Sequence, residues 1–120
     1  MPTPDPDVTY EILTQWAFTK AVKTYKELSQ AYHEQTGDWH EPYGSWNGPL
    51  GAINNRVWKG IEGPAISALV IKNETKEPGG DFWGCAPNVP QRPNNDVERV
   101  AVWSQIVNDV LAFNWPKRLP

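Results

Sequence analysis

The run from Gly63 to Gly84 restricts the possible folds of this chain more than any other segment. Residues 65–71 read Ala-Ile-Ser-Ala-Leu-Val-Ile, an apolar stretch with strong strand propensity. A polar loop follows and closes on Pro78-Gly79-Gly80, and the chain then continues through Asp81-Phe82-Trp83. A strand, a turn and a second short strand in this order predict a β-hairpin.

Helices are predicted before and after this hairpin from apolar spacing and from capping residues. Thr24 and Glu27 have the spacing of a capping box, and Gly37 suits the end of the helix that they begin. Asp7 and Asn95 are the expected N-caps of two other helices. The four expected helices cover about residues 8–22, 24–35, 49–61 and 95–114.

Three helices, a hairpin and a C-terminal helix packed back on them predict an α+β domain of winged-helix-like form. Residues 1–7 alternate proline with small or acidic residues and are expected to be a flexible leader. Residues 8–120 have the length of a single globular domain.

Composition excludes several classes of protein. The net charge is −3, so the strongly basic surface of many nucleic-acid-binding proteins is absent. Cys85 is the only cysteine, which excludes an intrachain disulfide and fits a reducing compartment. No apolar run reaches the roughly 20 residues of a membrane span. The first residues also lack the pattern of a secretory signal. These features predict a cytoplasmic protein with no membrane association and no cofactor.

Nucleic-acid-binding residues are predicted on the third helix and on the loop of the hairpin. Asn and Arg side chains can read base edges, and Lys side chains can contact phosphates. The residues expected to do so are Asn47, Asn54, Asn55, Arg56 and Lys59 on the helix, and Lys72, Asn73 and Lys76 on the loop. The alternative is an ordinary solvated helix face and a polar turn, and the acidic charge balance favours that alternative.

A second candidate site is His40 with Asp38 and Glu41. Histidine titrates near neutral pH and could act as a general base oriented by either carboxylate. The same side chains could bind a metal together with His33. However, the spacing between His33 and His40 matches no standard zinc pattern, and a plain surface loop is the favoured interpretation. Cys85 needs an activating histidine to be a nucleophile, so we expect it to pack as a small apolar side chain.

The C-terminal helix is apolar on more than one side, which indicates either a wrapped helix or an interaction surface. A protein–protein or homodimer interface would use Trp103, Ile106, Val110 and Phe113. The tryptophans of the loops, Trp39, Trp46 and Trp83, could converge on a ligand, although core packing is the favoured role of such large rings.

Four motifs occur in a fixed order along the chain: Thr-Tyr-Lys-Glu-Leu at residues 24–28, Gly-Pro-Leu-Gly-Ala-Ile at 48–53, Gly-Pro-Ala-Ile-Ser-Ala-Leu-Val-Ile at 63–71 and Thr-Lys-Glu-Pro-Gly-Gly-Asp-Phe at 75–82. This series resembles a group of small, largely uncharacterised bacterial and phage-associated domains with the pattern tYxxL…LGxI…PxIxxLVxNxxTGxPGxGF. The chain departs from that pattern at Lys72-Asn73 and at Lys76, where the group more often has Asn-Lys and Gly. The resemblance implies a bacterial or phage origin and assigns no chemistry.

The chain also resembles, more distantly, the winged-helix half of alkylguanine alkyltransferases and alkyltransferase-like proteins, which place a tYxxLA helix before a recognition helix. Their reactive Pro-Cys-His-Arg segment is replaced here by Gly-Pro-Ala-Ile at residues 63–66, so alkyl transfer is not implied. The resulting prediction is a small non-enzymatic module that binds nucleic acid or a nucleic-acid-processing complex, in phage defence or counter-defence. A protein–protein module and a small enzyme using His40 are the alternatives.

Overall fold

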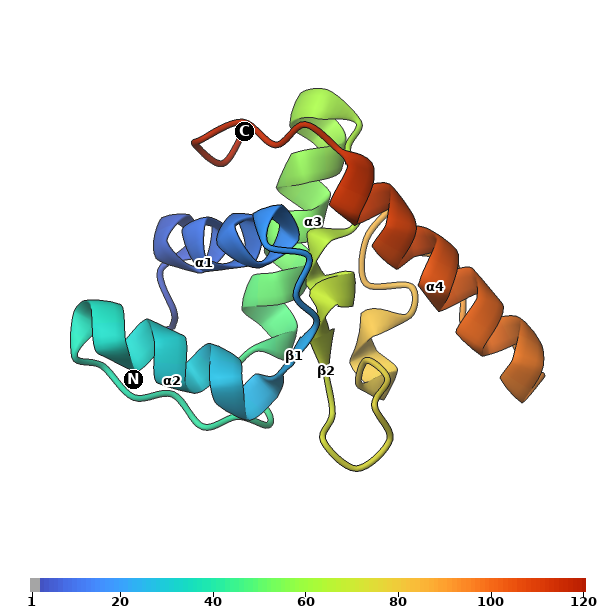
Figure 1. The fold of residues 1–120 in the computed structure, drawn as a ribbon, viewed down its shortest axis with the longest axis horizontal. Coiled ribbons are helices and arrows are strands. Elements are labelled where there is room, and N and C mark those ends of the chain that lie inside the picture. Colours follow the sequence, from blue (N-terminus) through green and yellow to red (C-terminus); the bar gives the residue numbers. More distant parts are fainter. Residues whose placement is uncertain (1–2) are drawn as a thin grey trace.

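The computed structural model describes residues 3–120, in which four α-helices surround a small two-stranded sheet (Figure 1). The helices are α1 (Pro6–Phe18), α2 (Tyr25–Thr36), α3 (Asn47–Ile61) and α4 (Asp96–Ala112). The strands are β1 (Lys23–Thr24) and β2 (Val70–Ile71), and two 3-10 turns are η1 (Ile66–Leu69) and η2 (Gly80–Phe82). Helices combined with a small sheet agree with the predicted mixture of α and β structure.

Two of the predicted helix starts are confirmed by their caps. Thr24 accepts a hydrogen bond from the Glu27 N–H at 3.2 Å, and the Glu27 carboxylate accepts from the Thr24 N–H at 3.1 Å, which completes the capping box of α2. Gly37 ends this helix in the left-handed conformation at φ +80°. Asn95 caps α4 by accepting from the Glu98 N–H at 3.1 Å.

The N-terminal prediction needs correction. Helix α1 begins at Pro6 rather than Val8, because the Asp5 carboxylate accepts from the Asp7 N–H at 2.8 Å and so takes the capping role. Pro4 is buried, the Asp5 N–H donates to the Tyr32 hydroxyl at 2.7 Å, and residues 6–7 are helical, so residues 4–7 pack with the rest of the domain. Residues 1–2 lie outside the described residues.

Helix α1 also ends earlier than predicted, at Phe18 instead of Val22. Lys20 has φ +58°, a left-handed conformation that stops a helix. The Ala21 N–H then donates to the Trp16 carbonyl at 2.8 Å, which closes the helix end and directs the chain into β1.

The predicted β-hairpin is wrong. Between Gly63 and Gly84 only Val70–Ile71 forms a strand, and it pairs in parallel with β1, with Lys23 opposite Val70 and Thr24 opposite Ile71. The expected second strand is the turn η2, in which the Phe82 N–H donates to the Gly79 carbonyl at 3.0 Å. Pro78 has no N–H to continue a ladder, so the chain turns away from β2. A winged-helix topology is therefore not confirmed.

The centre of the fold is the segment Ala65–Ile71, in which every residue is buried. Turn η1 packs against α1, α3 and α4, and β2 contacts α2, so one short segment meets all four helices (Figure 1). Asn54 fastens α3 to it, because its Oδ1 accepts from the Ser67 N–H at 3.2 Å and its Nδ2 donates to the Ser67 Oγ at 2.7 Å. Burial on all sides explains the continuous apolar run that the sequence shows.

Across residues 3–120, no helix combines the length and the apolar character that crossing a membrane requires.

The free energy of unfolding should decrease at alkaline pH because of the buried phenol of Tyr10. This residue is 1% exposed, and its hydroxyl donates to the Pro116 carbonyl at 2.7 Å. Burial raises the pKa of Tyr10 to about 12. Above pH 10 the unfolded chain releases this proton while the folded chain keeps it, so stability decreases by up to about 1.4 kcal/mol per pH unit until the folded pKa is reached. Urea unfolding between pH 8 and pH 11 should show this loss, and Tyr10→Phe should reduce its slope. Equal slopes for the two proteins would contradict the prediction.

Candidate functional site

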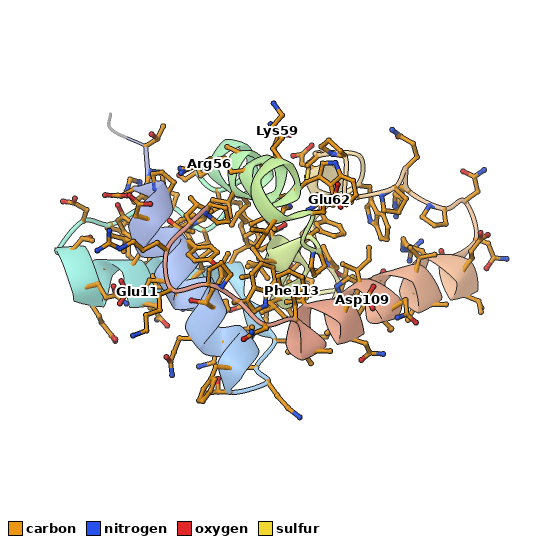
Figure 2. The ribbon with its side chains drawn as sticks, turned by 90° about the horizontal axis from the view of Figure 1, so that it is seen from above. Glu11, Arg56, Lys59, Glu62, Asp109 and Phe113 are labelled. Atoms are coloured by element: carbon orange, nitrogen blue, oxygen red, sulfur yellow. The ribbon has the colours of Figure 1, made fainter. Side chains whose placement is uncertain are left out.

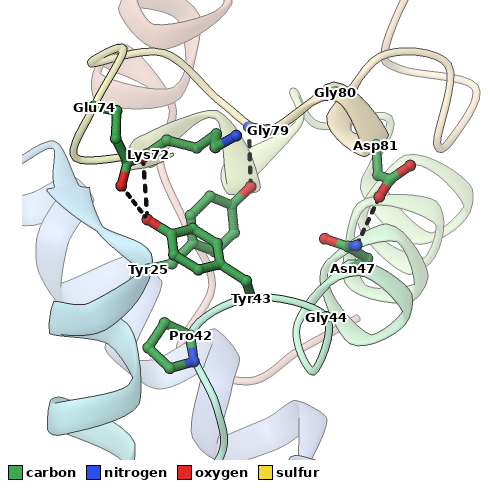
Figure 3. Close-up of a pocket in the computed structure, with 10 residues that line it drawn as sticks. All are labelled: Tyr25, Pro42, Tyr43, Gly44, Asn47, Lys72, Glu74, Gly79, Gly80 and Asp81. Atoms are coloured by element: carbon green, nitrogen blue, oxygen red, sulfur yellow. Dashed lines mark hydrogen bonds between the residues drawn. The ribbon is translucent and has the colours of Figure 1, made fainter.

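A pocket of about 440 Å³ lies where the N-terminal end of α3 meets two loops (Figure 3). The capping box places Tyr25 at the first position of α2, and Asn47 is the first residue of α3, so two helix starts fix two of its walls. The loops supply the remaining walls. The lining residues are Tyr25, Pro42, Tyr43, Gly44, Asn47, Lys72, Glu74, Gly79, Gly80 and Asp81.

Two tyrosines form the aromatic part of this pocket, with ring centroids 5.9 Å apart and planes inclined by 52°. Tyr25 is buried and its hydroxyl accepts from the Gly79 N–H at 3.2 Å. A side chain at position 79 would place its Cβ 3.2 Å from that hydroxyl, so glycine permits the close approach. Burial raises the pKa of Tyr25, which keeps the phenol neutral. Tyr43 is 54% exposed, so its ring is accessible to a ligand.

Polar groups surround these rings (Figure 3). The Tyr43 hydroxyl donates to the Glu74 carboxylate at 3.3 Å, and the Asn47 amide donates to Asp81 Oδ2 at 2.7 Å. The Lys72 ammonium lies 5.9 Å from the centre of the Tyr43 ring. The pocket therefore combines an aromatic face with two carboxylate acceptors and one cation.

A second, smaller pocket of about 150 Å³ adjoins the first, and both are lined by Lys72 and Gly80. Arg92 and Arg99 also line it, so it contains three cations against the single carboxylate of Glu77. Arg99 bonds to Glu77 at 2.8 Å and to Asp96 at 2.7 Å. The hydrogen bonds that Arg99 donates to Glu77 and to Asp96 raise the pKa of Arg99 above its ordinary value, so this guanidinium is always charged. The second pocket is thus basic.

The structure brings together only part of the predicted nucleic-acid surface. Asn47 and Lys72 both line the first pocket. The expectation that Asn54 faces a ligand is wrong, because its side chain is fully buried and bonded to Ser67. A helix has one buried stripe, and position 54 falls inside it beside Ile53 and not on the solvent side.

The other predicted residues lie elsewhere. Arg56 and Lys59 are exposed on the C-terminal half of α3 (Figure 2), whereas Asn47, the first residue of that helix, lines the pocket. Arg56 donates to the Pro120 O at 3.1 Å, and Asn55 is half-buried. On the loop, the Lys76 ammonium donates to Asn73 Oδ1 at 3.0 Å, and both residues are exposed.

His40 is placed by aromatic packing. Its ring lies edge-on to Tyr32 and Trp46, with centroids 5.1 and 5.9 Å away. The Glu41 carboxylate accepts instead from an indole N–H at 3.2 Å. Within residues 3–120, no hydrogen bond joins His40 to Asp38 or to Glu41, so the arrangement of a general base with its orienting carboxylate is not formed there.

Cys85 is half-buried, and the Asn54 amide donates to its sulfur at 3.5 Å. Burial raises the pKa of Cys85, which disfavours the thiolate. Among the residues that the structure describes, no group of three or more His, Cys, Asp or Glu side chains could hold a metal ion.

The four residues predicted as an interaction surface on α4 divide into two pairs. Val110 is fully buried, and the Trp103 indole donates to the Ala68 carbonyl at 2.9 Å, so these two residues fasten α4 to the core. Ile106 and Phe113 are half-buried and line a groove beside α3.

Sequence reasoning missed Tyr25, Tyr43, Asp81 and Arg92 as site residues. Tyr25 was noted only as part of a capping box, and Arg92 lies in a proline-rich connector without a pattern of its own. The available signal was Gly79-Gly80, since paired glycines often mark a close approach of the backbone to another group.

Comparison of the chain with models of protein families, with curated proteins and with solved structures gave no match. The geometry of the two adjoining pockets is therefore the main basis for the functional argument.

Proposed function

We propose that this protein is a non-enzymatic binding module that holds single-stranded nucleic acid across the two adjoining pockets. The observation that carries the proposal is the position of Lys72 and Gly80, which line both the aromatic pocket and the basic pocket. A nucleotide has an aromatic part joined to an anionic part, and the pair of pockets offers a complement to each. Base–aromatic stacking with backbone contacts is the usual means of binding single strands.

The base would stack on Tyr43, whose ring is accessible and whose hydroxyl is held by Glu74. Asp81 and Glu74 supply carboxylate acceptors beside this ring. Carboxylates accept from the N–H groups of a base edge, and guanine presents two adjacent donors on its Watson–Crick edge. We therefore expect bases with exposed donors, guanine first, to be preferred.

Two successive phosphates would lie at the basic pocket, one against Lys72 and the other against Arg92. Arg99 contributes less because Glu77 and Asp96 already neutralise it. If two phosphates are neutralised, the slope of log affinity against log salt for a single strand is about −1.4. Such a shallow slope is compatible with a chain of net charge −3.

A single strand fits this site better than a duplex, because stacking on Tyr43 needs a base that is free of its neighbours. Arg56 and Lys59, which a recognition helix would use, lie in the C-terminal half of α3, whereas the pocket is at the start of that helix. The resemblance to phage-associated domains suggests the setting: an adaptor, effector or inhibitor in phage defence or counter-defence.

Replacement of Tyr43 with alanine should weaken the binding of a labelled single-stranded oligonucleotide by about tenfold, since stacking of one base contributes about 1–3 kcal/mol. Lys72→Ala should also weaken binding and make the salt slope shallower by about 0.7. Fluorescence anisotropy with single-stranded DNA, single-stranded RNA and duplex DNA at several salt concentrations measures both effects.

The matched control for Tyr43→Ala is Trp39→Ala, which removes another exposed aromatic ring outside the pocket. We expect this control to bind like the wild type. Equal affinity of the Tyr43 variant and the wild type, or equal losses in both variants, would contradict the proposal.

A further inference from the structure

A groove of about 720 Å³ lies between the C-terminal ends of α3 and α4, at the other end of α3 from the two pockets. Its apolar lining includes two aromatic rings, three prolines and an isoleucine: Trp58, Phe113, Pro64, Pro87, Pro90 and Ile106. Trp58 is 39% exposed although it is a large apolar side chain. Aromatic-lined grooves bind extended peptide segments in several peptide-recognition domains.

The groove is also electronegative. Glu62 lies on the α3 side, and Asp109 and Phe113 lie on the α4 side (Figure 2). Both helices point their C-terminal ends at the groove, and a helix C-terminus carries partial negative charge. The last turn of α4 contains no basic residue that would offset this charge.

The two carboxylates have no cationic partner within residues 3–120, where the salt bridges involve only Arg99. Asp109 accepts a hydrogen bond from the neutral Gln105 amide at 2.9 Å. The nearest lysine in sequence, Lys59, points away from Asp109 and Phe113 (Figure 2). The complement of this groove is therefore a cation attached to apolar groups.

We infer that this groove binds a short segment of a partner protein in which Arg or Lys is adjacent to apolar side chains. The apolar side chains would pack on Trp58 and Phe113, and the cation would lie between Glu62 and Asp109. The tail of a second copy, Lys-Arg-Leu-Pro at residues 117–120, has related chemistry. However, Leu119 is already buried in its own chain, and Arg56 donates to the Pro120 O, so this tail is engaged.

The test begins with selection of a random peptide library on the full chain, followed by synthesis of the enriched peptides. We expect them to contain Arg or Lys next to apolar residues. Anisotropy should then show about tenfold weaker binding to the double variant Glu62→Gln with Asp109→Asn, as expected when two partly exposed charge pairs are lost. Trp58→Ala should weaken binding at least as much, because tryptophan is a frequent binding hot spot.

The matched control carries Glu11→Gln with Glu34→Gln, which changes the net charge equally at two exposed positions outside the groove. We expect this control to bind each peptide as the wild type does. Thermal melting of all variants checks that each is folded, and an unlabelled oligonucleotide should not displace the peptide.

Three outcomes would overturn the inference. The first is a selection that enriches no peptide above background, or enriches peptides without a cation. The second is equal affinity of the groove variant and the control variant. The third is a concentration-dependent dimer in sedimentation that Glu62→Gln with Asp109→Asn dissociates, which would assign the groove to a second copy of this chain.

Discussion

Alanine in place of Trp46 should lower the free energy of unfolding by about 3–5 kcal/mol, which is the usual cost of removing a fully buried large aromatic side chain. Trp46 is 0% exposed, and its indole N–H donates to Ser29 Oγ at 2.9 Å. Its ring lies edge-on to Tyr32 and His40, so one side chain fixes the loop before α3 to α2. The change to alanine would leave a cavity in the core and would also remove the hydrogen-bond partner of the Ser29 hydroxyl.

Urea unfolding measures this effect. With a slope of about 2 kcal/mol per molar urea, the midpoint should fall by about 2 M while the slope stays constant. Trp46→Phe should cost less, because it keeps most of the ring volume and loses only the hydrogen bond. Trp39→Ala, at a position that is 45% exposed, is the control and should change stability by less than about 0.5 kcal/mol. An unchanged midpoint for Trp46→Ala would show that the loop does not depend on this ring.

Aspartate in place of Val110 should unfold the chain and not merely separate subunits. Val110 is 0% exposed in the core, and a buried carboxylate without a partner is among the few single changes that cost more than about 4 kcal/mol. A domain of this size has a total stability of about 5–15 kcal/mol, so a cost of this size is comparable to the whole at the lower end of that range. Loss of the far-ultraviolet circular dichroism signal at 37 °C is the expected observation.

The same helix offers a matched control in Val97→Asp. Val97 is 79% exposed in the first turn of α4, where a negative charge interacts favourably with the helix dipole. This variant should be as stable as the wild type or slightly more stable. A folded monomer carrying Val110→Asp would contradict core burial and would return Val110 to the interaction surface that the sequence predicts.

The helices could be predicted from the sequence because their signals are local. A capping box, a terminal glycine and an apolar stripe each involve residues within a few positions of one another, as at Thr24, Gly37 and Leu50. The start of α1 was missed by only two positions, because both Asp5 and Asp7 are good caps and the sequence does not choose between them.

The pairing of β2 could not be predicted, because it depends on contacts distant in sequence. Val70 pairs with Lys23, whereas the hairpin pattern suggested the residues after Pro78. A continuous apolar run fits a strand and equally fits a segment that is buried on all sides. The contacts of this segment with four helices bury it on all sides, and no local sequence pattern indicates those contacts.

The candidate site shows the same limit. Asn47 and Asn54 were both predicted from their residue type and their place on the third helix, but Asn47 lines the pocket and Asn54 lies in the core. Only the direction of each side chain on α3 distinguishes them. Tyr25 and Tyr43 meet because the start of α2 and the loop before α3 converge, which is a tertiary contact that residue spacing does not report.

The central position of Ala65–Ile71 has a consequence for synthesis of the chain on the ribosome. This segment is translated before α4, which begins at Asp96 and supplies part of its cover. Until α4 has been made, the part of this segment that α4 covers in the folded chain stays exposed. The segment is uncharged, free of proline and apolar except for Ser67, which is close to the composition of aggregation-prone sequences. Chains that are released before α4 is complete should therefore accumulate as insoluble material, and the last helix acts as the cover that ends this exposure.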